Sequence, residues 1–363
     1  MQQYRERIEA ALSRYRDPWL ETDLRSAGVL TDVQEEGGVL KVVLTLGYPC
    51  ADISAGLGET LARLIGDETG TSVQVEIRQQ IQPHRAQRNL RNLDGVRNIV
   101  AVASGKGGVG KSTTTINLAL AMAHAGARVG VLDADIYGPS LGLMVGVASG
   151  THPESDDAKY FKPIQALGLQ TMSMAYLIDE TTPMVWRGPM VSGALQQLLT
   201  QTLWDDLDYL FIDMPPGTGD VQLTLSQKVP VTGAVIVTTP QDIALLDAKK
   251  GIEMFRKVDI PVLGVVENMS THICSNCGHE EPIFGAGGGE RIAAQYDTEL
   301  LGSLPLSLQI REQTDAGMPT VVADPQGPAA QAYLDIARRI AGRVAVRNVA
   351  QGPAFPNISV END

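Results

Sequence analysis

One short segment of the chain has a spacing that is typical of phosphate binding. Gly105-Lys-Gly-Gly-Val-Gly-Lys-Ser112 satisfies the pattern G-x-x-x-x-G-K-[ST], directly after the apolar run 99–103 and before a helical pattern. Glycines let such a loop turn its N–H groups toward phosphate oxygens, and the helix start adds a favourable partial charge. We predict that Lys111 reaches the β- and γ-phosphates and that the Ser112 hydroxyl ligates Mg²⁺. The residues expected to contact the nucleotide here are Gly105, Lys106, Gly107, Gly108, Val109, Gly110, Lys111, Ser112 and Thr113.

Carboxylates follow two further predicted strands. The run 128–132 leads into Asp133-Ala-Asp135, and the run 209–212 leads into Asp213. Ligands of a doubly wound sheet bind at the carboxyl ends of its strands, so these side chains belong near the phosphate loop. We expect Asp213 to hold the magnesium, Asp135 to position the attacking water and Asp133 to contribute to the nucleotide site. Helix or turn capping is the alternative role for an aspartate at such a position.

A pair of cysteines follows the predicted strand 262–266. Cys274-Ser-Asn-Cys277 has the C-x-x-C spacing, and His279 lies close behind it. Two thiolates supply half of the ligands of a [4Fe-4S] cluster or a tetrahedral zinc ion, and a C-x-x-C pair also occurs as a redox dithiol. Spacing alone leaves these three readings open. The third cysteine, Cys50, stands alone, and a lone cysteine is more often a small buried apolar residue.

Most of the chain alternates strands with helices. Short, nearly continuous Val/Ile-rich runs indicate strands that are buried on both faces, and their alternation with helices favours a parallel sheet covered on both sides. The predicted strands are 99–103, 128–132, 169–172, 209–212, 234–237, 262–266 and 300–304. The fold class is therefore α/β, with the doubly wound, mostly parallel sheet of a P-loop NTPase and a small N-terminal α+β domain.

A small α+β domain is predicted to precede this sheet, over residues 1–80. Its pattern predicts a helix over 2–15, a strand over 39–46, a helix over 53–65 and a strand over 71–77. The polar stretch 81–97 is expected to be a linker, residues 98–345 the ATPase domain and residues 346–363 a flexible tail.

Composition limits the classes of partner. The chain of 363 residues carries 42 Asp and Glu against 29 Lys and Arg, a net charge of -13, which argues against a nucleic-acid footprint. The sequence has no apolar run long enough to cross a bilayer, and its charged N-terminus differs from a secretory leader. We expect a cytoplasmic protein that binds neither nucleic acid nor membrane.

The motifs together resemble a known class of P-loop ATPases, and this resemblance implies a SIMIBI-like fold. Lys106 in K-G-G-V-G-K-S, with D-A-D-I-Y-G-P-S and I-D-M-P-P-G-T-G-D, is similar to the deviant Walker A proteins, which include MinD, ParA and the nitrogenase iron protein. The finer resemblance is to the Mrp/ApbC family of iron-sulfur cluster carriers, over most of residues 98–345. Residues 1–80 resemble the small domain that many members of this family carry.

The resemblance implies roles that spacing alone does not give. Lys106 would cross a homodimer interface and act on the partner's nucleotide as a catalytic positive charge, beside the catalytic Lys111 and Asp135. Asn268, in the N-M-S segment, would contact the adenine ring. Cys274 and Cys277 of two chains would bind one [4Fe-4S] cluster and pass it to apo-proteins, with ATP and Mg²⁺ as cofactors. The rival reading is a positioning ATPase of the MinD/ParA type with a structural zinc or no metal.

Overall fold

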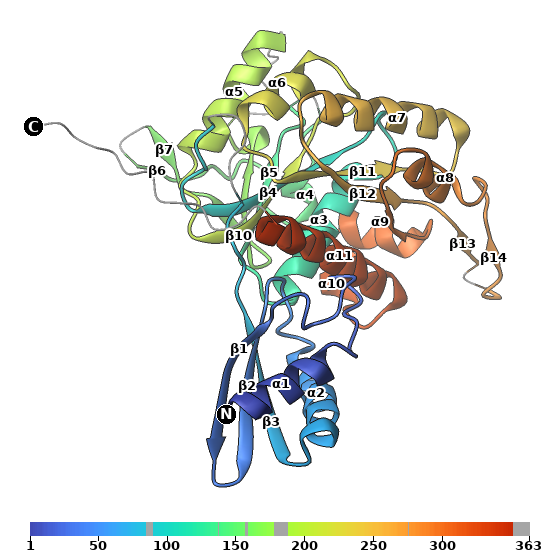
Figure 1. Cartoon of the computed structure of the whole chain (residues 1–363). Coiled ribbons are helices and arrows are strands. Elements are labelled where there is room, and N and C mark those ends of the chain that lie inside the picture. Colours follow the sequence, from blue (N-terminus) through green and yellow to red (C-terminus); the bar gives the residue numbers. More distant parts are fainter. Residues whose placement is uncertain (85–89, 137, 157–158, 178–187, 275, 351–363) are drawn as a thin grey trace, which may run out of the picture.

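A mostly parallel sheet of eight strands forms the centre of the molecule (Figure 1). The computed structural model describes residues 1–84, 90–136, 138–156, 159–177, 188–274 and 276–350. The strand order is β15-β12-β11-β4-β10-β5-β9-β8, and only the edge strand β8 runs antiparallel to its neighbour. The strands are β4 (Val96–Ala103), β5 (Val129–Asp133), β8 (Ile164–Ala166), β9 (Leu169–Ser173), β10 (Leu207–Asp213), β11 (Gly233–Thr238), β12 (Val262–Glu267) and β15 (Leu300–Ser303).

The strand β4 shows why the sheet is buried on both faces. Val100 and Val102 point into one hydrophobic core, whereas Ile99 and Ala101 point into the other. Successive side chains of a strand face opposite sides, so a continuous apolar run serves both cores. The predicted doubly wound, mostly parallel fold is confirmed, and all seven predicted strands are present.

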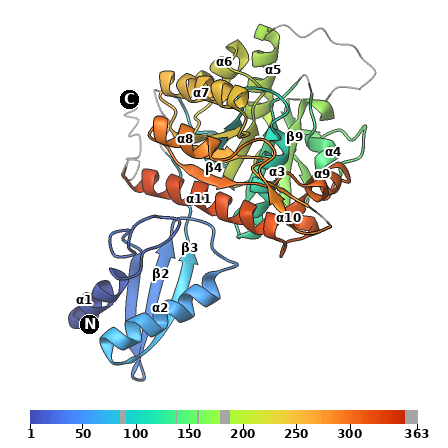
Figure 2. The same cartoon turned by 90° about the vertical axis from the view of Figure 1, so that its right-hand side faces the viewer.

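Helices cover both faces of the sheet, as Figures 1 and 2 show. On one face lie α3 (Lys111–His124), α10 (Thr320–Ala323) and α11 (Pro328–Ala350). The other face carries α5 (Gly188–Gln201), α6 (Asp220–Lys228), α7 (Asp242–Lys257) and α8 (Gly288–Gln295). Three short elements, α4 (Leu141–Met144), the 3-10 helix η1 (Met174–Tyr176) and α9 (Leu308–Asp315), follow strand ends.

The first eighty residues form a separate small sheet with two helices. The elements are α1 (Gln2–Leu12), β1 (Leu30–Glu36), β2 (Val39–Leu46), α2 (Ser54–Thr69) and β3 (Ser72–Gln79). Strand β2 pairs with β1 antiparallel and with β3 in parallel. The strand β1 was not predicted, because its polar sequence, ending in Gln34-Glu-Glu36, lies at an exposed edge and lacks an apolar run.

This small unit packs against helix α11. Asp52 forms an ion pair with Arg338, and the Arg338 guanidinium lies over the Trp19 ring. A Cβ at Gly342 would come within 2.2 Å of the Trp19 carbonyl oxygen, so the backbones touch there. Buried side chains of both parts form one continuous hydrophobic core, in which Cys50 is a packing residue and only 1% exposed.

Two small hairpins complete the described structure. The pair β6 (Ser155–Asp156) and β7 (Tyr160–Phe161) is antiparallel, as is the pair β13 (His272–Ile273) and β14 (Glu280–Glu281). The β13–β14 hairpin projects from the body of the molecule at the right of Figure 1. Among the described residues, no helix is both long and apolar enough to cross a membrane.

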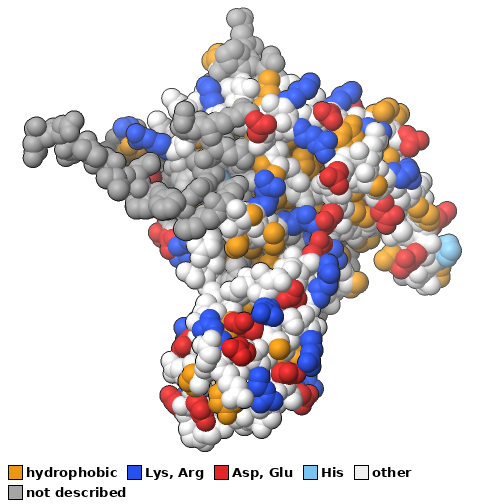
Figure 3. All heavy atoms as spheres, in the orientation of Figure 1, with side chains coloured by type: hydrophobic (Ala, Val, Ile, Leu, Met, Phe, Trp, Pro, Cys, Tyr) orange, Lys and Arg blue, Asp and Glu red, His pale blue; other side chains and the backbone are white. Residues whose placement is uncertain are grey.

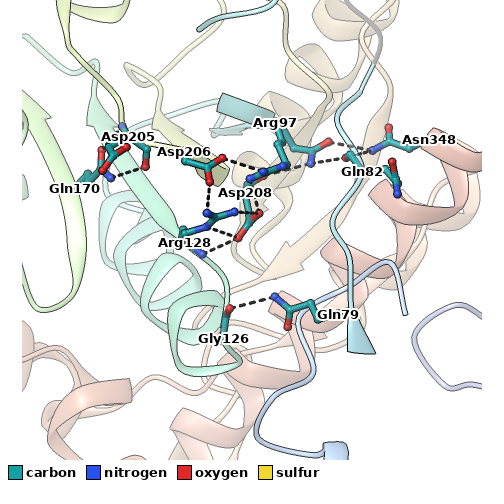
Figure 4. A network of polar contacts seen from close by, with 11 residues as sticks. Gln79, Gln82, Arg97, Gly126, Arg128, Gln170, Asp205, Asp206, Asp208 and Asn348 are labelled. Carbon is teal, nitrogen blue, oxygen red and sulfur yellow. Dashed lines mark hydrogen bonds and ion pairs between the residues drawn. The ribbon is translucent and has the colours of Figure 1, made fainter. Parts of the chain in front are cut away.

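The amino ends of the central strands are held by a polar network (Figure 4). Asp208, which is buried, accepts from Arg97 at 2.9 Å and from Arg128 at 3.1 Å, and Arg97 also pairs with Asp206 at 2.8 Å. Figure 4 shows Gln82 and Asn348 at the end of this network, where Asn348 donates to the Gln82 carbonyl. The polar contacts at this edge of the sheet hold the strands together, whereas the candidate functional residues lie at the opposite edge, where the strands end.

Two predicted boundaries differ from the structure. Val96 and Arg97 belong to β4 rather than to the linker predicted over 81–97, because Val96 pairs with Leu207 in the sheet. Residues 346–350 are the last part of α11 rather than a flexible tail, because Asn348 is held by hydrogen bonds to Gln82 and Asn98. Residues 85–89 and 351–363 of those two segments lie outside the described residues.

Candidate functional site

The register of the sheet brings the predicted carboxylates together. Asp213 of β10 lies beside Asp133 of β5 on one side and beside Val102 of β4 on the other. The phosphate loop begins at Gly105, three residues after Val102, so the acids and the loop meet at one carboxyl edge. The Gly217 N–H donates to the Ser104 carbonyl at 2.9 Å and ties the P-P-G-T-G segment to the start of the loop.

A buried ion pair occupies the centre of this edge. Lys111 Nζ lies 2.6 Å from Asp213 Oδ1, and both side chains are about 5% exposed. The same oxygen accepts from Thr115 Oγ1 at 2.9 Å, and Lys111 Nζ also donates to Ser112 Oγ at 3.2 Å. The predicted phosphate lysine and the predicted magnesium carboxylate thus neutralise one another's charge.

Asp133 is the most deeply buried acid of the site. Its carboxylate accepts from the N–H groups of Asp135 and Ser140 at 3.0 Å and of Leu141 at 3.2 Å. Burial, and second the negative charge of Asp213, raise the pKa of Asp133 from 3.8 to about 7. Asp133 therefore organises the turn that carries Asp135, since one carboxylate holds three backbone N–H groups of that turn.

The glycines of the loop fall into two groups. Gly105 and Gly110 are packed: a Cβ at Gly105 would come 2.1 Å from the carbonyl carbon of Asp247, and one at Gly110 would come 2.2 Å from Asn268 Nδ2. Gly107 and Gly108 face open space, and Gly108 has a positive φ of 82° that suits glycine. The loop is therefore clamped at its ends and open in its middle, where phosphates would approach.

The start of helix α3 fits an anion. The helix begins at Lys111, and no side chain caps its N-terminus. Its first N–H groups lack intrahelical partners and carry a partial positive charge, which a phosphate would satisfy. Ser112 and Thr113 lie half-buried in this first turn, and Lys106 lies half-buried in the loop before it. The residues present fit a nucleotide with its magnesium ion.

Asn268 has a structural contact that the sequence did not predict. Its Nδ2 donates to the carbonyl oxygen of Val109 at 2.9 Å, and its side chain is 8% exposed. The Asn268 side chain therefore holds the phosphate loop in place through this hydrogen bond. The adenine contact of Asn268 stays a prediction.

Sequence reasoning missed Thr115, which touches Asp213. The residue stands four positions after Lys111, and residues at this spacing share one face of a helix. That spacing could have placed Thr115 on the side of α3 that faces the strand ends. It lies next to the ion pair and adds a second donor to the Asp213 carboxylate.

The cysteine pair lies at the tip of the β13–β14 hairpin. The N–H of Cys274 donates to the His279 carbonyl at 2.9 Å, and the N–H of Gly278 donates to the Cys274 carbonyl at 2.8 Å. These bonds bring Cys274 back against Gly278 and His279 in a tight turn, in which Gly278 has a φ of 70°. Cys274 is half-buried and Cys277 is exposed.

The turn also favours the thiolate form of one cysteine. Hydrogen bonds to the Cys274 sulfur, from the backbone of Cys277 first and of Asn276 second, lower the pKa of its thiol. Within the described residues, no group of three or more His, Cys, Asp or Glu side chains is arranged to hold a metal ion. In the part of the chain that the structure describes, the two thiols therefore have no third ligand beside them, and His279 is not assembled with them as a zinc site.

These features define the class of the protein. A phosphate loop between a central strand and a helix, with acids at the neighbouring strand ends, is the arrangement of a doubly wound P-loop NTPase. The family model described as NUBPL iron-transfer P-loop NTPase matches residues 95–341, and the chain belongs to this family. A second model, described as iron-sulfur cluster assembly protein, matches residues 5–77.

Individual relatives agree with the family. An iron-sulfur cluster carrier protein of Pseudomonas fragi is 68% identical over 267 residues, which are 74% of this chain and 93% of the relative. The iron-sulfur cluster carrier protein of Escherichia coli is 49% identical over 350 residues, 96% of this chain and 94% of the relative. A nucleotide-binding protein of Archaeoglobus fulgidus, solved in complex with ADP, superposes with a TM-score of 0.57 at 37% identity and covers 66% of this chain and 93% of its own.

Proposed function

We propose that this protein is an ATP-hydrolysing, homodimeric carrier that binds a [4Fe-4S] cluster through Cys274 and Cys277 of two chains and delivers it to apo-proteins. One observation carries the proposal: a complete phosphate site and an incomplete, outward-facing pair of thiols occur in the same chain. A [4Fe-4S] cluster needs about four thiolates, and two chains supply them. The carrier names of the relatives support this cargo.

The nucleotide would be held by the loop and the helix start. Lys111 and the open N–H groups at Gly107 and Gly108 would bind phosphate oxygens. Ser112 with Asp213 would ligate Mg²⁺, whose positive charge would stabilise the negative charge that develops on the phosphates during hydrolysis. Lys111 must leave Asp213 to reach a phosphate. The carboxylate that it leaves then requires a cation, so binding of nucleotide and of magnesium is coupled through one side chain.

The remaining acids would act beside this pair. Asp133 holds the turn that presents Asp135, and Asp135 would orient the attacking water. Lys106 would act across the interface of a dimer, as a positive charge on the partner's nucleotide.

A second copy of the chain is the partner that the loop face suits. Ile243 and Leu246 of α7 are 70% and 58% exposed, and the adjacent Asp247 packs directly on Gly105. Two large apolar side chains beside the phosphate loop are expected to be covered in the assembled protein. Closure of this face would bring Lys106 of each chain toward its partner.

The domain division follows from the same proposal. Residues 1–80 would be an iron-sulfur-assembly domain joined by the segment 81–97 to the ATPase domain 98–345. Apo iron-sulfur proteins would be the other partners, with no nucleic-acid or membrane partner, in the cytoplasm. The acidic charge of the chain, -13, supports the exclusion of nucleic acid.

Anaerobic reconstitution with ferrous iron and sulfide tests the cargo. We expect a brown chromophore with about four irons per dimer. The double variant Cys274→Ala, Cys277→Ala should stay colourless, whereas Cys50→Ala should reconstitute, because Cys50 is a buried packing residue.

A zinc-bound or metal-free positioning ATPase is the rival function. Stoichiometric zinc with no chromophore would contradict the carrier proposal and support a structural zinc at the hairpin. Co-sedimentation with DNA or liposomes in the presence of ATP would support the MinD/ParA-type alternative instead.

A further inference from the structure

A large cavity lies beneath the cysteine hairpin and apart from the phosphate loop. Its volume is about 1030 Å³, and it opens at the carboxyl ends of β12 and β15. The arms of the hairpin form one wall, through Ile273 and Glu280, and helix α8 forms another, through Glu290. None of residues 104–113, all of which the structure describes, lines it. Cavities of this size suit drug-sized ligands or short peptide segments.

The charges around this cavity are all of one sign. The acids that line it are Glu267, Glu280, Glu290 and Asp324, and no Lys or Arg is among its described lining residues. In the described part of the chain, none of these four carboxylates has an ion-pair partner; Glu267 accepts a hydrogen bond from the Gly289 N–H. Uncompensated carboxylates around a concave site attract a cation.

The spread of these acids argues against a single metal ion as the ligand. No three of the His, Cys, Asp or Glu side chains that the structure describes converge as metal ligands. A cation that meets carboxylates from the hairpin, from α8 and from the end of α10 must be extended or carry several charges.

A buried hydroxyl in the wall also indicates a missing polar partner. Thr320 lines the cavity and is 2% exposed, and its Oγ1 has no hydrogen-bond partner in the structure. A buried hydroxyl without a partner is unfavourable, and such groups are rare in native proteins. A ligand with polar atoms would satisfy it.

Apolar side chains at the same site give the ligand its second property. Ile273 and Leu308 line the cavity and are 43% and 63% exposed, and Leu306 and Ile310 lie beside them. The hairpin, at the right of Figure 3, presents acidic and hydrophobic side chains on one face. The ligand that fits is therefore both basic and apolar.

We propose that this cavity binds a basic, apolar peptide segment of an apo client protein and so holds the client beside the cysteine pair. This inference rests on the proposed carrier function. The occupant of the cavity is not the second copy of the chain. The proposed dimer brings the two cysteine tips together at the cluster, but insertion of the partner's acidic lining into the cavity would place like-charged acids against one another.

The hairpin is joined to the cavity wall by hydrogen bonds, so an occupant would contact the element that carries the thiols. The Leu306 N–H donates to the Thr271 carbonyl at 2.8 Å, and His272 forms an isolated parallel β-bridge with Leu306. Ile273, whose side chain lines the cavity, directly precedes Cys274. A client segment in the cavity would therefore lie within a few residues of the cluster ligands.

Fluorescence anisotropy with the full, metal-free chain tests the proposal. The probe is a labelled peptide of alternating lysine and leucine, and its counterpart has glutamate in place of lysine. We expect the lysine peptide to bind and the glutamate peptide not to bind. The double variant Glu280→Lys, Glu290→Lys should weaken binding by about 10-fold or more.

A matched control has the same change of net charge outside the cavity. Glu281→Lys with Glu312→Lys reverses one exposed acid on the hairpin and one on α9, neither of which lines the cavity, and should leave the affinity unchanged. Equal weakening in both double variants would overturn the proposal, because it would show general attraction to an acidic protein. Equal binding of the glutamate peptide would also overturn it.

A second measurement covers a variant that fails to fold. Amide hydrogen exchange of the unchanged protein should slow, on addition of the lysine peptide, in residues 270–273 and 305–310 and in α8; protection confined to other regions would overturn the proposal. Both measurements use metal-free protein, so peptide binding by a chain that takes up no cluster would separate a failed carrier function from a failed client site.

Discussion

The phosphate loop and the cysteine hairpin both follow strands of one parallel sheet, yet they are built in opposite ways. The loop is clamped by Asp247 and Asn268 and lies over a buried Lys111–Asp213 pair. The hairpin tip is exposed, is held by two backbone hydrogen bonds and offers two ligands where a cluster needs more. A site that binds the same small ligand in every cycle gains from preorganisation, whereas a site that exchanges cargo must stay accessible.

The largest expected effect tests whether the loop is the centre of turnover. Lys111→Ala should lower the ATP hydrolysis rate by about 1,000-fold, because it removes the charge that meets the phosphates. Lys41→Ala, an exposed lysine on β2, is the control. A steady-state phosphate-release assay measures both, and an unaffected rate in Lys111→Ala would refute the phosphate site.

The next largest effect distinguishes the role of Lys106 from that of Lys111, the other lysine of the loop. Lys106→Ala should lower turnover by about 100-fold while nucleotide affinity of the single chain stays within a few fold, because Lys106 is proposed to act on the partner's nucleotide. Hydrolysis rates over a range of protein concentrations, with calorimetric nucleotide binding, give both quantities. A loss of binding equal to that of Lys111→Ala would place both lysines on one nucleotide.

The rate at which thiols react compares the accessibility of the two hairpin cysteines with that of the buried Cys50. Burial first, then the charge of Asp52, raise the pKa of Cys50 to about 11. We expect Cys274 and Cys277 to react with iodoacetamide at least about 50-fold faster than Cys50 at neutral pH, because each unit of pKa removes about tenfold of the thiolate. Peptide mass spectrometry follows the three sites, and similar rates would contradict the description of the hairpin as the accessible site.

A pair of asparagines compares the rigidity of the two sites. Asn268→Ala should lower the free energy of unfolding by about 1–2 kcal/mol, because it leaves the buried Val109 carbonyl without its donor. Asn276→Ala, at the exposed hairpin tip, should change it by less than about 0.5 kcal/mol. Urea unfolding measures both, and equal losses would remove the contrast between a clamped loop and an open hairpin.

The remaining effect is a pH dependence at the carboxyl edge of the sheet. The folded chain keeps a proton on Asp133 between 3.8 and about 7, where the unfolded chain has released it. The stabilisation from this group is therefore greatest below 3.8 and is lost as the pH rises toward 7. Between about pH 5 and about pH 8, the free energy of unfolding of Asp133→Asn should rise relative to that of the unchanged chain.

The sequence predicted those parts whose cause is local. The strand over 39–46 has the observed bounds because Val39-Leu-Lys-Val-Val-Leu-Thr-Leu46 is apolar throughout its buried positions. The phosphate loop was predicted because the fixed positions of its pattern, at Gly105, Gly110, Lys111 and Ser112, each have a specific role. Asp133 and Asp213 were predicted at one edge because parallel strands end together, and their register confirms it.

The parts that escaped prediction depend on contacts between distant residues. The edge strands β1 and β8 form because each pairs with a neighbouring strand of its own sheet, and their own sequence patterns do not indicate a strand. The pairing of Lys111 with Asp213 joins residues 102 positions apart, and the Asn268 bond to Val109 joins residues 159 apart. The cavity beneath the hairpin combines α8, β15 and the start of α11, which no local pattern relates.

The contact of the N-terminal unit with α11 has a consequence for shorter forms of the protein. Trp19 and Gly47 lie against Gly342 and Ala345, small residues that leave the helix surface without charge at those points. Removal of residues 1–80 would expose this strip to water next to Val346 and Val349, which are already 45% and 69% exposed. A truncated protein is therefore expected to precipitate at concentrations at which the whole chain stays in solution.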